Sequence, residues 1–426
     1  MQVSSFKTLF QAASSDFWKY WGGQVISSFG SSFTSFAIPL LIFKLTNSAI
    51  NLSLSFVVNM LPYLLFGLII GAWVDRTNRK RLMIVTDLLR AGVIASLPLL
   101  AFLGFLPIWW IYIVLFFSSA LSISFDSAGV AAIPTLVKQE DLMTANGRIF
   151  ASYSLVNVLG PLLAALLLTI VPLPALLWID ACSFLVSAAS LFWVKGPFNS
   201  HSNEKKAPTS IRQDIVEGLR YILTHPLFRW LAFLLFLVNL IVPTIYVEIV
   251  LFAKQVLAVS DQGLGIFYSV GSIGVVVVSL AAGKLPKRWS FGVVGLGSLM
   301  IQGLLTIALA FTRLYWLALP LWALNFSMSS LFNINITSLA QASIPNHLLG
   351  RVASFMKVLT WSLGPLGTFI CGIIIERSQN VALVYGWLGV LAFLIPISFL
   401  FTSLGRAKRY QPYKEIAPVK EVSASQ

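Results

Sequence analysis

The sequence predicts an all-α integral membrane protein with 12 transmembrane helices in two parallel, pseudo-symmetric six-helix bundles. Of its 426 residues, 58% are hydrophobic and only 10% are charged, whereas a soluble domain carries about 25% charged residues. Apolar blocks of about 20 residues or more, the length that crosses a bilayer as a helix, recur along the whole chain. Motifs of the first six blocks recur in the last six, which indicates two related halves.

The expected spans cover residues 18–44, 50–74, 82–104, 107–133, 143–170, 174–194, 227–253, 261–283, 290–311, 314–342, 350–376 and 381–404. They give a first bundle at 1–194, a central linker at 195–226, a second bundle at 227–404 and a tail at 405–426. The first span is longer than the core of a signal peptide, so we expect it to remain in the membrane. In the linker, apolar residues at spacings of three and four predict an amphipathic helix from Ser210 to Leu223, lying on the membrane surface.

Lys and Arg are distributed unevenly between the two sides of the predicted membrane. The side with the amino terminus, the linker and the tail carries 23 of the 29, and the other side carries Lys44, Lys254, Arg313 and Arg377. Cytoplasmic loops are enriched in Lys and Arg. We therefore expect a multi-pass protein of the cell membrane with both termini cytoplasmic, and the net charge of +14 needs no nucleic-acid partner.

The halves resemble one another most clearly at two Gly-Pro pairs. Gly160-Pro161 and Gly364-Pro365 occupy corresponding places in the fifth and eleventh spans, each preceded by a Gly-Arg pair. Proline kinks a helix, and small residues beside it allow neighbouring helices to approach closely. Transporters built from two related halves bind their substrate between the halves near the middle of the membrane. This repetition favours a transporter over a receptor or a simple channel.

A charged loop joins the second and third spans. It runs from Gly71 to Arg81 and contains Asp75, Arg76, Arg79 and Lys80. It resembles the loop Gly-x-x-x-Asp-Arg-x-Gly-Arg-Lys/Arg between helices two and three of the major facilitator superfamily. Asn78 stands at the second glycine of that pattern, and Asn tolerates the left-handed backbone better than most residues. The resemblance extends over most of the chain, to the branch of macrolide-type drug exporters and siderophore exporters.

The resemblance implies that this loop is a gate. In the family the Asp of the loop, here Asp75, is held against the start of helix eleven, and the Arg at position 79 pairs with an acid in helix four, here Asp126. A plain anchor of positive charge at the cytoplasmic surface is the simpler interpretation. Many members of the branch carry an acid in helix one where this sequence has Ser31, so a coupling proton would have to use other carboxyl groups.

Three acids inside the spans are candidates for proton or substrate binding, because a charge at mid-membrane costs about 2.5–3.5 kcal/mol. Asp126 either has such a role or serves only as the partner of Arg79. Glu248 either couples protons or pairs with Lys254 at the membrane surface. For Asp180 a structural hydrogen-bonding role is favoured. We also expect Arg90 and Asp87, three residues apart on one helix, to form a pair.

Polar and flexible side chains at helical spacing predict the wall of a substrate cavity, and the resemblance to the superfamily implies that helices one, four, seven and ten line it. The candidates are Ser28, Ser31, Ser35, Ser122, Tyr246, Asn325, Met328, Phe332 and Asn335. Met and aromatic side chains accommodate amphipathic molecules of varied shape. For the serines, helix packing is an equally good explanation.

The sequence contains no phosphate-binding Gly-x-x-x-x-Gly-Lys-[Ser/Thr] motif, and its three His residues are dispersed. We therefore expect no cofactor, no metal site and no enzyme activity. The leading hypothesis is a monomeric secondary transporter in the bilayer that exports a hydrophobic or amphipathic small molecule, such as a macrolide-like drug, by alternating access in exchange for protons. Export of a siderophore or another secreted metabolite is the alternative within this fold. A non-transporting receptor or scaffold is the alternative from another class.

Overall fold

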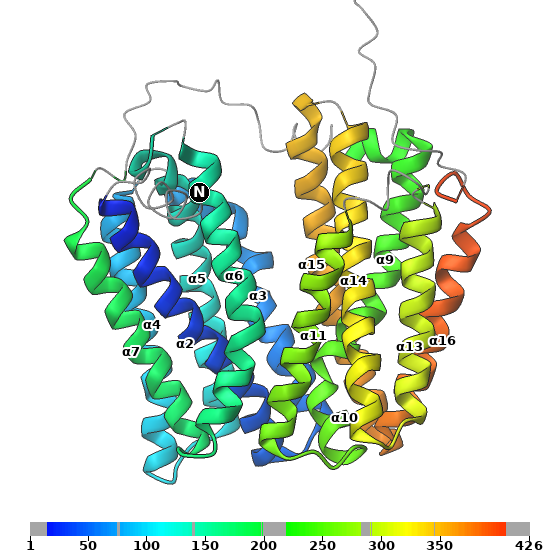
Figure 1. Ribbon diagram of the computed structural model, residues 1–426, viewed down its shortest axis with the longest axis horizontal. Helices are drawn as coiled ribbons and strands as arrows, with labels where there is room; N and C mark the ends of the chain where they lie inside the picture. Colours follow the sequence, from blue (N-terminus) through cyan, green and yellow to red (C-terminus); the bar gives the residue numbers. More distant parts are fainter. Residues whose placement is uncertain are drawn as a thin grey trace, which may run out of the picture.

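The computed structural model describes residues 15–74, 77–138, 141–196, 198, 219–282, 290, 292–344 and 346–405, and over these residues all regular structure is helical. The first bundle contains α2 (Ser15–Thr46), α3 (Ala49–Val74), α4 (Arg79–Phe102), α5 (Ile108–Leu136), α6 (Leu142–Leu167) and α7 (Leu173–Trp193). The second contains α9 (Pro226–Val247), α10 (Ile249–Gln255), α11 (Asp261–Ala282), the π-helix η2 (Gly292–Leu296), α13 (Gly297–Phe311), α14 (Tyr315–Ser343), α15 (Asn346–Ser378) and α16 (Val381–Phe399). Figure 1 shows the two bundles side by side.

Twelve spans follow from these helices. Eleven helices of the described residues are long and apolar enough to cross a membrane, and α15, with 33 residues, supplies the twelfth. The all-helical fold with 12 spans in two bundles is therefore confirmed, and the predicted boundaries are right to within a few residues. The seventh span differs, because Glu248 ends α9 and begins α10. Most of the amphipathic helix predicted from Ser210 to Leu223 lies outside the described residues.

Local hydrogen bonds explain two helix starts. The side chain of Asn78 accepts a hydrogen bond from the backbone N–H of Arg81 at 3.0 Å, and Asn380 caps α16 in the same way. Such caps satisfy N–H groups that have no partner within the helix. Asn78 has φ of −74°, so its place in the loop depends on capping and not, as the sequence suggested, on tolerance of the left-handed backbone.

The bundles meet along two seams, where α3 packs on α15 and α6 packs on α11. Both seams depend on glycine. A Cβ atom on Gly265 of α11 would collide with Ala165 of α6, and one on Gly372 of α15 would collide with the Ser53 hydroxyl of α3. The seams bring the backbones close at one end of the molecule, and the bundles diverge toward the other (Figure 1). We call the end with α10 the closed end and the end where α2 begins the open end.

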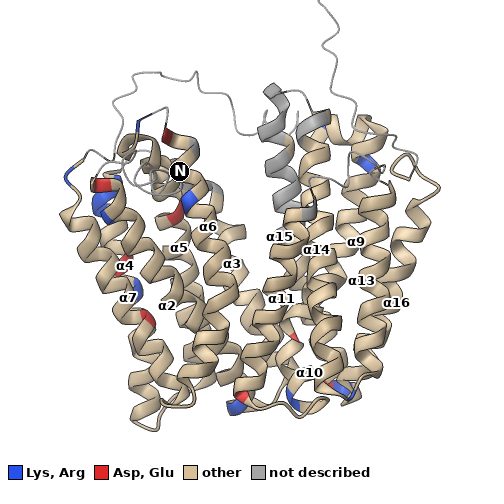
Figure 2. Ribbon diagram, in the orientation of Figure 1, with Lys and Arg blue, Asp and Glu red and all other residues tan. Residues whose placement is uncertain are grey.

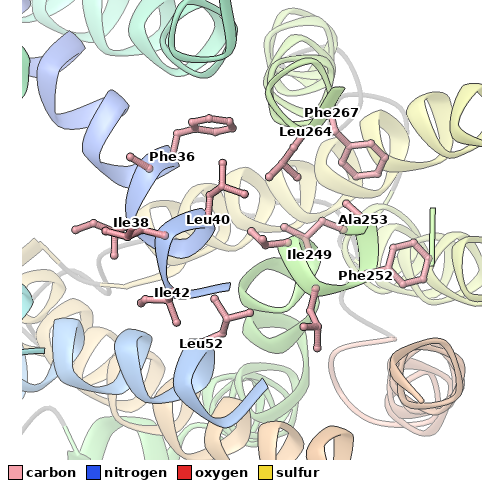
Figure 3. Close-up of a cluster of buried hydrophobic side chains, with 14 of the residues drawn as sticks. Phe36, Ile38, Leu40, Ile42, Leu52, Ile249, Phe252, Ala253, Leu264 and Phe267 are labelled. Atoms are coloured by element: carbon pink, nitrogen blue, oxygen red, sulfur yellow. The ribbon is translucent and has the colours of Figure 1, made fainter. Parts of the chain in front are cut away.

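Apolar packing fills the closed end. Phe36, Ile38, Leu40 and Ile42 of α2 and Leu52 of α3 belong to one buried cluster with Ile249, Phe252 and Ala253 of α10 and Leu264 and Phe267 of α11. Figure 3 shows the side chains of the two bundles facing one another across this cluster. Because the cluster contains residues of both bundles, it forms an apolar plug between them.

Candidate functional site

Adjoining cavities lead from the plug toward the open end. The first, of about 480 Å³, is lined by residues that include Ser31, Ser35, Asn59, Tyr63, Arg90 and Ser122. The second, of about 420 Å³, shares Ser31, Ser35, Arg90 and Ser122 with the first and adds Ser28, Asp126 and Asn157. A third, of about 260 Å³, shares Ser28 and Asp126 with the second and reaches Tyr20 and Trp21 near the start of α2. Together they form a path along the first bundle.

Arg90 of α4 is the central charge of this path. It lines both larger cavities, and its guanidinium carbon lies 4.0 Å from the centre of the Phe184 ring. A guanidinium stacked on an aromatic ring is stabilised by the electrostatic attraction of the ring face. The expected pair with Asp87 does not form an ion pair. The Asp87 carboxyl is fully buried instead, without a hydrogen bond in the part of the chain that the structure describes.

Asp126 of α5 is exposed to the cavity. Its carboxylate accepts a hydrogen bond from Ser122 one turn earlier, at 3.5 Å. The partner implied by the family resemblance, Arg79, donates instead to the backbone carbonyls of Ala131 and Phe198, at 3.0 and 3.3 Å. Asp126 therefore remains available to a proton or to a substrate in the cavity.

Asp180 of α7 lies behind the serines of α2 and is only 1% exposed. One carboxylate oxygen accepts a hydrogen bond from Thr34, and the other accepts one from Ser183 at 3.3 Å. A Cβ atom on Gly30 would collide with this arrangement. These contacts hold α2 against α7, as expected for a structural hydrogen-bonding residue.

The second bundle contributes aromatic side chains to the cavity. Tyr246 of α9 and Tyr268 of α11 line the first cavity. Tyr246 also forms a hydrogen bond with Gln302, whose amide nitrogen lies 3.0 Å from its hydroxyl oxygen, and its ring packs edge to face on Phe326. The aromatic wall thus faces the serine-rich wall of the first bundle.

Three of the four candidates on α14 line none of the cavities described here. Asn325 is fully buried and donates hydrogen bonds to the Gln302 carbonyl and the Thr306 hydroxyl of α13. It therefore holds α14 against α13 within the second bundle. Met328 packs in a small apolar cluster with Val294 and Leu331. Asn335 is buried. Of the four, only Phe332 lines a cavity described here, one of about 260 Å³ between α9, α13 and α14.

Of the gating loop suggested by the sequence, the structure describes the contacts of Arg79 and Lys80. Asp75 and Arg76 lie outside the described residues, and of Gly71 only the helical backbone at the end of α3 is described. Lys80 donates to the carbonyls of Phe192 and Val194, at 3.1 and 2.7 Å. Lys80 therefore fastens the start of α4 to the end of α7, and Arg79 fastens it to α5 and to Phe198.

The Gly-Pro pairs lie at helix contacts. A Cβ atom on Gly160 would collide with Ser32 of α2, and the Pro161 carbonyl lies against Gly265 of α11. Gly364 faces Pro243 of α9. Gly160-Pro161 thus supports the seam between the bundles, and Gly364-Pro365 supports packing within the second bundle.

Polar contacts join the bundles at the closed end. Asp261 at the start of α11 binds Lys44 of α2 and Lys254 of α10. The Glu376 carboxylate of α15 accepts from the Ser48 hydroxyl and the Ala49 backbone N–H at the start of α3, both at 2.9 Å. A carboxylate at a helix N-terminus is stabilised by the helix dipole and the free N–H groups.

Glu248 is fully buried in this seam. Its carboxyl oxygen Oε1 lies 2.6 Å from the Ser53 hydroxyl of α3. The alternative pair with Lys254 does not form, since Lys254 binds Asp261. Glu248 therefore faces the other bundle and not the membrane surface.

Sequence reasoning missed Arg90 as a cavity residue and Glu376 as a contact between bundles. Arg90 could have been found from its place in mid-span, because such charges face the interior of a bundle. The Glu376 contact has no local signal, since its partners lie more than 300 residues away in the chain. Among the described residues no cluster of His, Cys, Asp or Glu could hold a metal ion.

Comparison with known proteins agrees with this architecture. The chain is 32% identical over 203 residues to macrolide efflux protein A of Streptococcus pyogenes, a match that covers 48% of this chain and about half, 50%, of that protein. It is 27% identical over 383 residues to the multidrug efflux pump Tap of Mycolicibacterium fortuitum, covering 86% of this chain and 92% of that one. The crystal structure of the nucleoside transporter NupG superposes with a TM-score of 0.76 at 11% identity, covering 93% of this chain and all of the other, 100%.

The family model of the Major Facilitator Superfamily matches residues 20–368. Two six-helix bundles around a polar path and a match over most of the chain lead to one conclusion: the protein is a multi-pass membrane protein that belongs to the Major Facilitator Superfamily.

Proposed function

We propose that this protein is a transporter that exports amphipathic small molecules, drugs among them, by alternating access. The observation that carries the proposal is the path of cavities past Arg90 and Asp126, which the apolar plug and the seam contacts block at the closed end. A substrate enters at the open end and leaves when the bundles rock and the plug separates. The efflux relatives support the direction of transport.

The open end is proposed to be cytoplasmic. Lys44, Lys254, Arg313 and Arg377, the basic residues of the poorer side, lie at the closed ends of their helices, and cytoplasmic loops are the Lys- and Arg-rich ones. In this orientation both chain termini are cytoplasmic. The rocking units are residues 1–194 and 227–404, joined by the linker 195–226 and followed by the tail 405–426, in a monomer.

The lining suggests what the substrate looks like. The serines of α2 and α5 offer hydrogen bonds along one wall, and Tyr246 and Tyr268 offer aromatic faces on the other. Volumes of about 480 and 420 Å³ lie within the range of drug-sized pockets, about 300–1,000 Å³. The serine wall also favours a second candidate, a secreted metabolite rich in hydrogen-bonding groups, such as a siderophore.

Proton exchange is proposed to drive export. One proton crossing about 100 mV releases about 2.3 kcal/mol, which supports between one and two decades of concentration ratio. Asp126 is the proposed shared site, because it is exposed to the cavity and holds only a long hydrogen bond from Ser122. Competition of proton and substrate for one carboxyl group couples their movements.

Proteoliposomes test the proposal. A pH gradient is imposed, and uptake of a panel of macrolides and fluorescent amphipathic drugs is measured with and without an uncoupler. We expect accumulation that the uncoupler abolishes and that Asp126→Asn reduces about tenfold or more, whereas Asp141→Asn, near the start of α6, serves as a control and keeps it. Accumulation that ignores the gradient would refute proton coupling, and the absence of any drug movement together with movement of siderophores would favour the second candidate.

A further inference from the structure

Glu248 takes part in a hydrogen-bonded chain that crosses the seam between the bundles. The Ser53 hydroxyl oxygen of α3 lies 2.6 Å from Glu248 Oε1 and 3.0 Å from the backbone carbonyl oxygen of Thr368 in α15. Ser53 belongs to the first bundle, and Glu248 and Thr368 belong to the second. All three residues are fully buried. The chain therefore exists only while the seam is closed.

The number of hydrogens limits this arrangement. A hydroxyl group carries one hydrogen, a carbonyl oxygen only accepts, and an ionised carboxylate only accepts. Ser53 thus has two acceptors within hydrogen-bonding distance but one hydrogen to give. A protonated Glu248 supplies the second hydrogen: it donates to Ser53, and Ser53 donates to Thr368. The distances of 2.6 and 3.0 Å then both belong to O–H···O hydrogen bonds.

The surroundings of Glu248 offer no cation to an ionised carboxylate. Two ammonium groups of the closed end, those of Lys254 in α10 and Lys44 in α2, both bind Asp261, and no Lys, Arg or His in the described residues forms an ion pair with Glu248. The second carboxyl oxygen, Oε2, has no partner there. An unpaired charge in such a site is costly, whereas a neutral carboxyl with one donated hydrogen bond is not.

The other titratable groups around Glu248 do not replace a cation. On α15, Cys371 is a neutral thiol and Glu376 is a like charge held at the start of α3. On α16, Tyr385 uses its hydroxyl hydrogen for the Ile245 carbonyl at 2.6 Å. On α9, Tyr246 lines the cavity. The packed segment of α3 contributes Ser53, which does not titrate.

We propose that Glu248 is a proton-dependent latch: it carries a proton while the closed end is sealed, and loss of this proton releases the link from Ser53 to Thr368 so that the closed end opens. The inference rests on the proposed function for the direction of the cycle. Its geometry, a hydroxyl with one hydrogen between two acceptors of the opposite bundle, is independent of the substrate.

The latch has a route for its proton. Leu52 and Val247, the chain neighbours of Ser53 and Glu248, line the first cavity. When the closed end is open, water there delivers the proton to the Glu248 carboxylate. When it is sealed, the O–H bond of Glu248 breaks toward water in the cavity, which takes the proton and leaves the carboxylate behind. The latch therefore carries one proton per cycle in the direction opposite to an exported substrate, separately from the proton that Asp126 exchanges for substrate.

Distances between spin labels test the latch without any substrate. Cys182 and Cys371 are replaced by Ser and Ala, and labels are attached to Cys at Phe105 and Leu314, exposed loop residues at the closed ends of the first and second bundles. Double electron–electron resonance then measures the open and sealed populations in nanodiscs. We expect the open population to rise about tenfold as the pH increases from about 6 to about 9.

Substituted variants test whether the pH dependence of the open population comes from the latch. In Glu248→Gln, the amide donates a hydrogen bond at every pH, so we expect a sealed population that does not change with pH. Ser53→Ala removes the link while keeping the carboxyl group, and we expect a larger open population at low pH and at least a threefold weaker response. The matched control is Glu376→Gln, a second carboxyl group in the same seam, which we expect to retain the pH response.

A pH response in Glu248→Gln equal to that of the unsubstituted protein would overturn the latch, even if proton-driven drug export were found. If Glu248→Gln fails to insert into the membrane, an unchanged pH response in Ser53→Ala would overturn the latch equally. Conversely, a pH response that depends on Glu248, in a protein that moves no drug under any gradient, would refute the proposed function and leave the latch in place.

Discussion

The two bundles share a helical plan but differ in where they carry charge. In the first, Arg90, Asp126 and Asp180 line the cavities, and Figure 2 shows charged segments within the helices of that bundle as well as at their ends. In the second, Glu248 is buried in the seam, and the cavity wall is aromatic. Lys357 of α15 is a further charge of that bundle, but its side chain lies outside the described residues.

This difference suggests a division of labour. Arg90 and Asp126 of the first bundle face a space large enough for a substrate, so they can recognise it. The carboxyl group of the second bundle faces a serine of the other bundle, so it can sense whether the bundles are joined. A pseudo-symmetric fold thus places recognition on one half and control of the seam between the halves.

Arg90→Ala is the most damaging change that this comparison predicts. Arg90 is the only cation among the described residues that line the three adjoining cavities. Hydrogen bonds to charged groups contribute about 1.5–3 kcal/mol, so the loss corresponds to about tenfold or more in apparent affinity. The concentration dependence of drug efflux measures this, and Arg313→Ala, at the closed end, is the control. Equal affinities in the two variants would remove Arg90 from the site.

Gly372→Ala tests whether the seam closes only when the backbones of α3 and α15 approach closely. The added methyl group would collide with the Ser53 hydroxyl and lie 3.1 Å from the Ala49 carbonyl oxygen, both on α3. Overpacking costs about 1–3 kcal/mol, so we expect the ratio of sealed to open protein to fall by about 5- to 150-fold.

The same label pair at the closed end measures the effect of Gly372→Ala. Gly297→Ala is the matched control, because a Cβ atom there meets nothing within 4 Å. If both variants keep the sealed distance, the packing of α3 on α15 does not limit closure.

Substitutions of Asp126 and Asp180 should have different effects, the first on drug transport and the second on the stability of the protein. Asp180 is buried and accepts hydrogen bonds from Thr34 and Ser183, so Asp180→Ala should destabilise the protein by about 1–3 kcal/mol. Asp126 faces the cavity, so Asp126→Asn should change stability by no more than about 0.5 kcal/mol while it reduces gradient-driven drug uptake about tenfold or more. Thermal unfolding followed by size-exclusion fluorescence, together with uptake assays, checks both. If Asp126→Asn lowered the stability and Asp180→Ala affected only drug uptake, Asp126 would be the structural residue and Asp180 the coupling residue.

The fold could be predicted from the sequence because its signal is local and repeated. Each span needs only an apolar run of sufficient length, and the Gly-Pro pairs indicated the duplication. The break of the seventh span at Glu248 was not predicted, since an apolar run does not reveal where a backbone bends. The cap formed by Asn78 was also missed, because a helix start and a loop that resembles a family pattern coincide there.

The site could be predicted only in part. Ser31, Ser35 and Ser122 were found from their spacing, and they line the cavity together with Tyr246. Asn325 and Met328 have the same spacing on α14 yet face the interior of the second bundle. Helical periodicity identifies a polar face but not the neighbour that this face meets, and that choice depends on how α13 and α14 pack.

Among the contacts that join the two bundles at the closed end, we expect the ion pair between Lys44 and Asp261 at the surface to contribute least. The Lys44 side chain is 48% exposed and that of Lys254 only 12%, although both bind Asp261. Exposed pairs contribute about 0.2–1 kcal/mol and are screened by salt. Lys44→Ala should therefore reduce the sealed population by about fivefold or less, an effect that disappears in about 1 M salt. Lys254→Ala also breaks the bond to the Val259 carbonyl at 2.8 Å, so its effect should be larger and persist in salt. Equal responses of the two variants would mean that burial does not set the strength of these contacts, and that the seam closes through its apolar plug and the Glu248 chain alone.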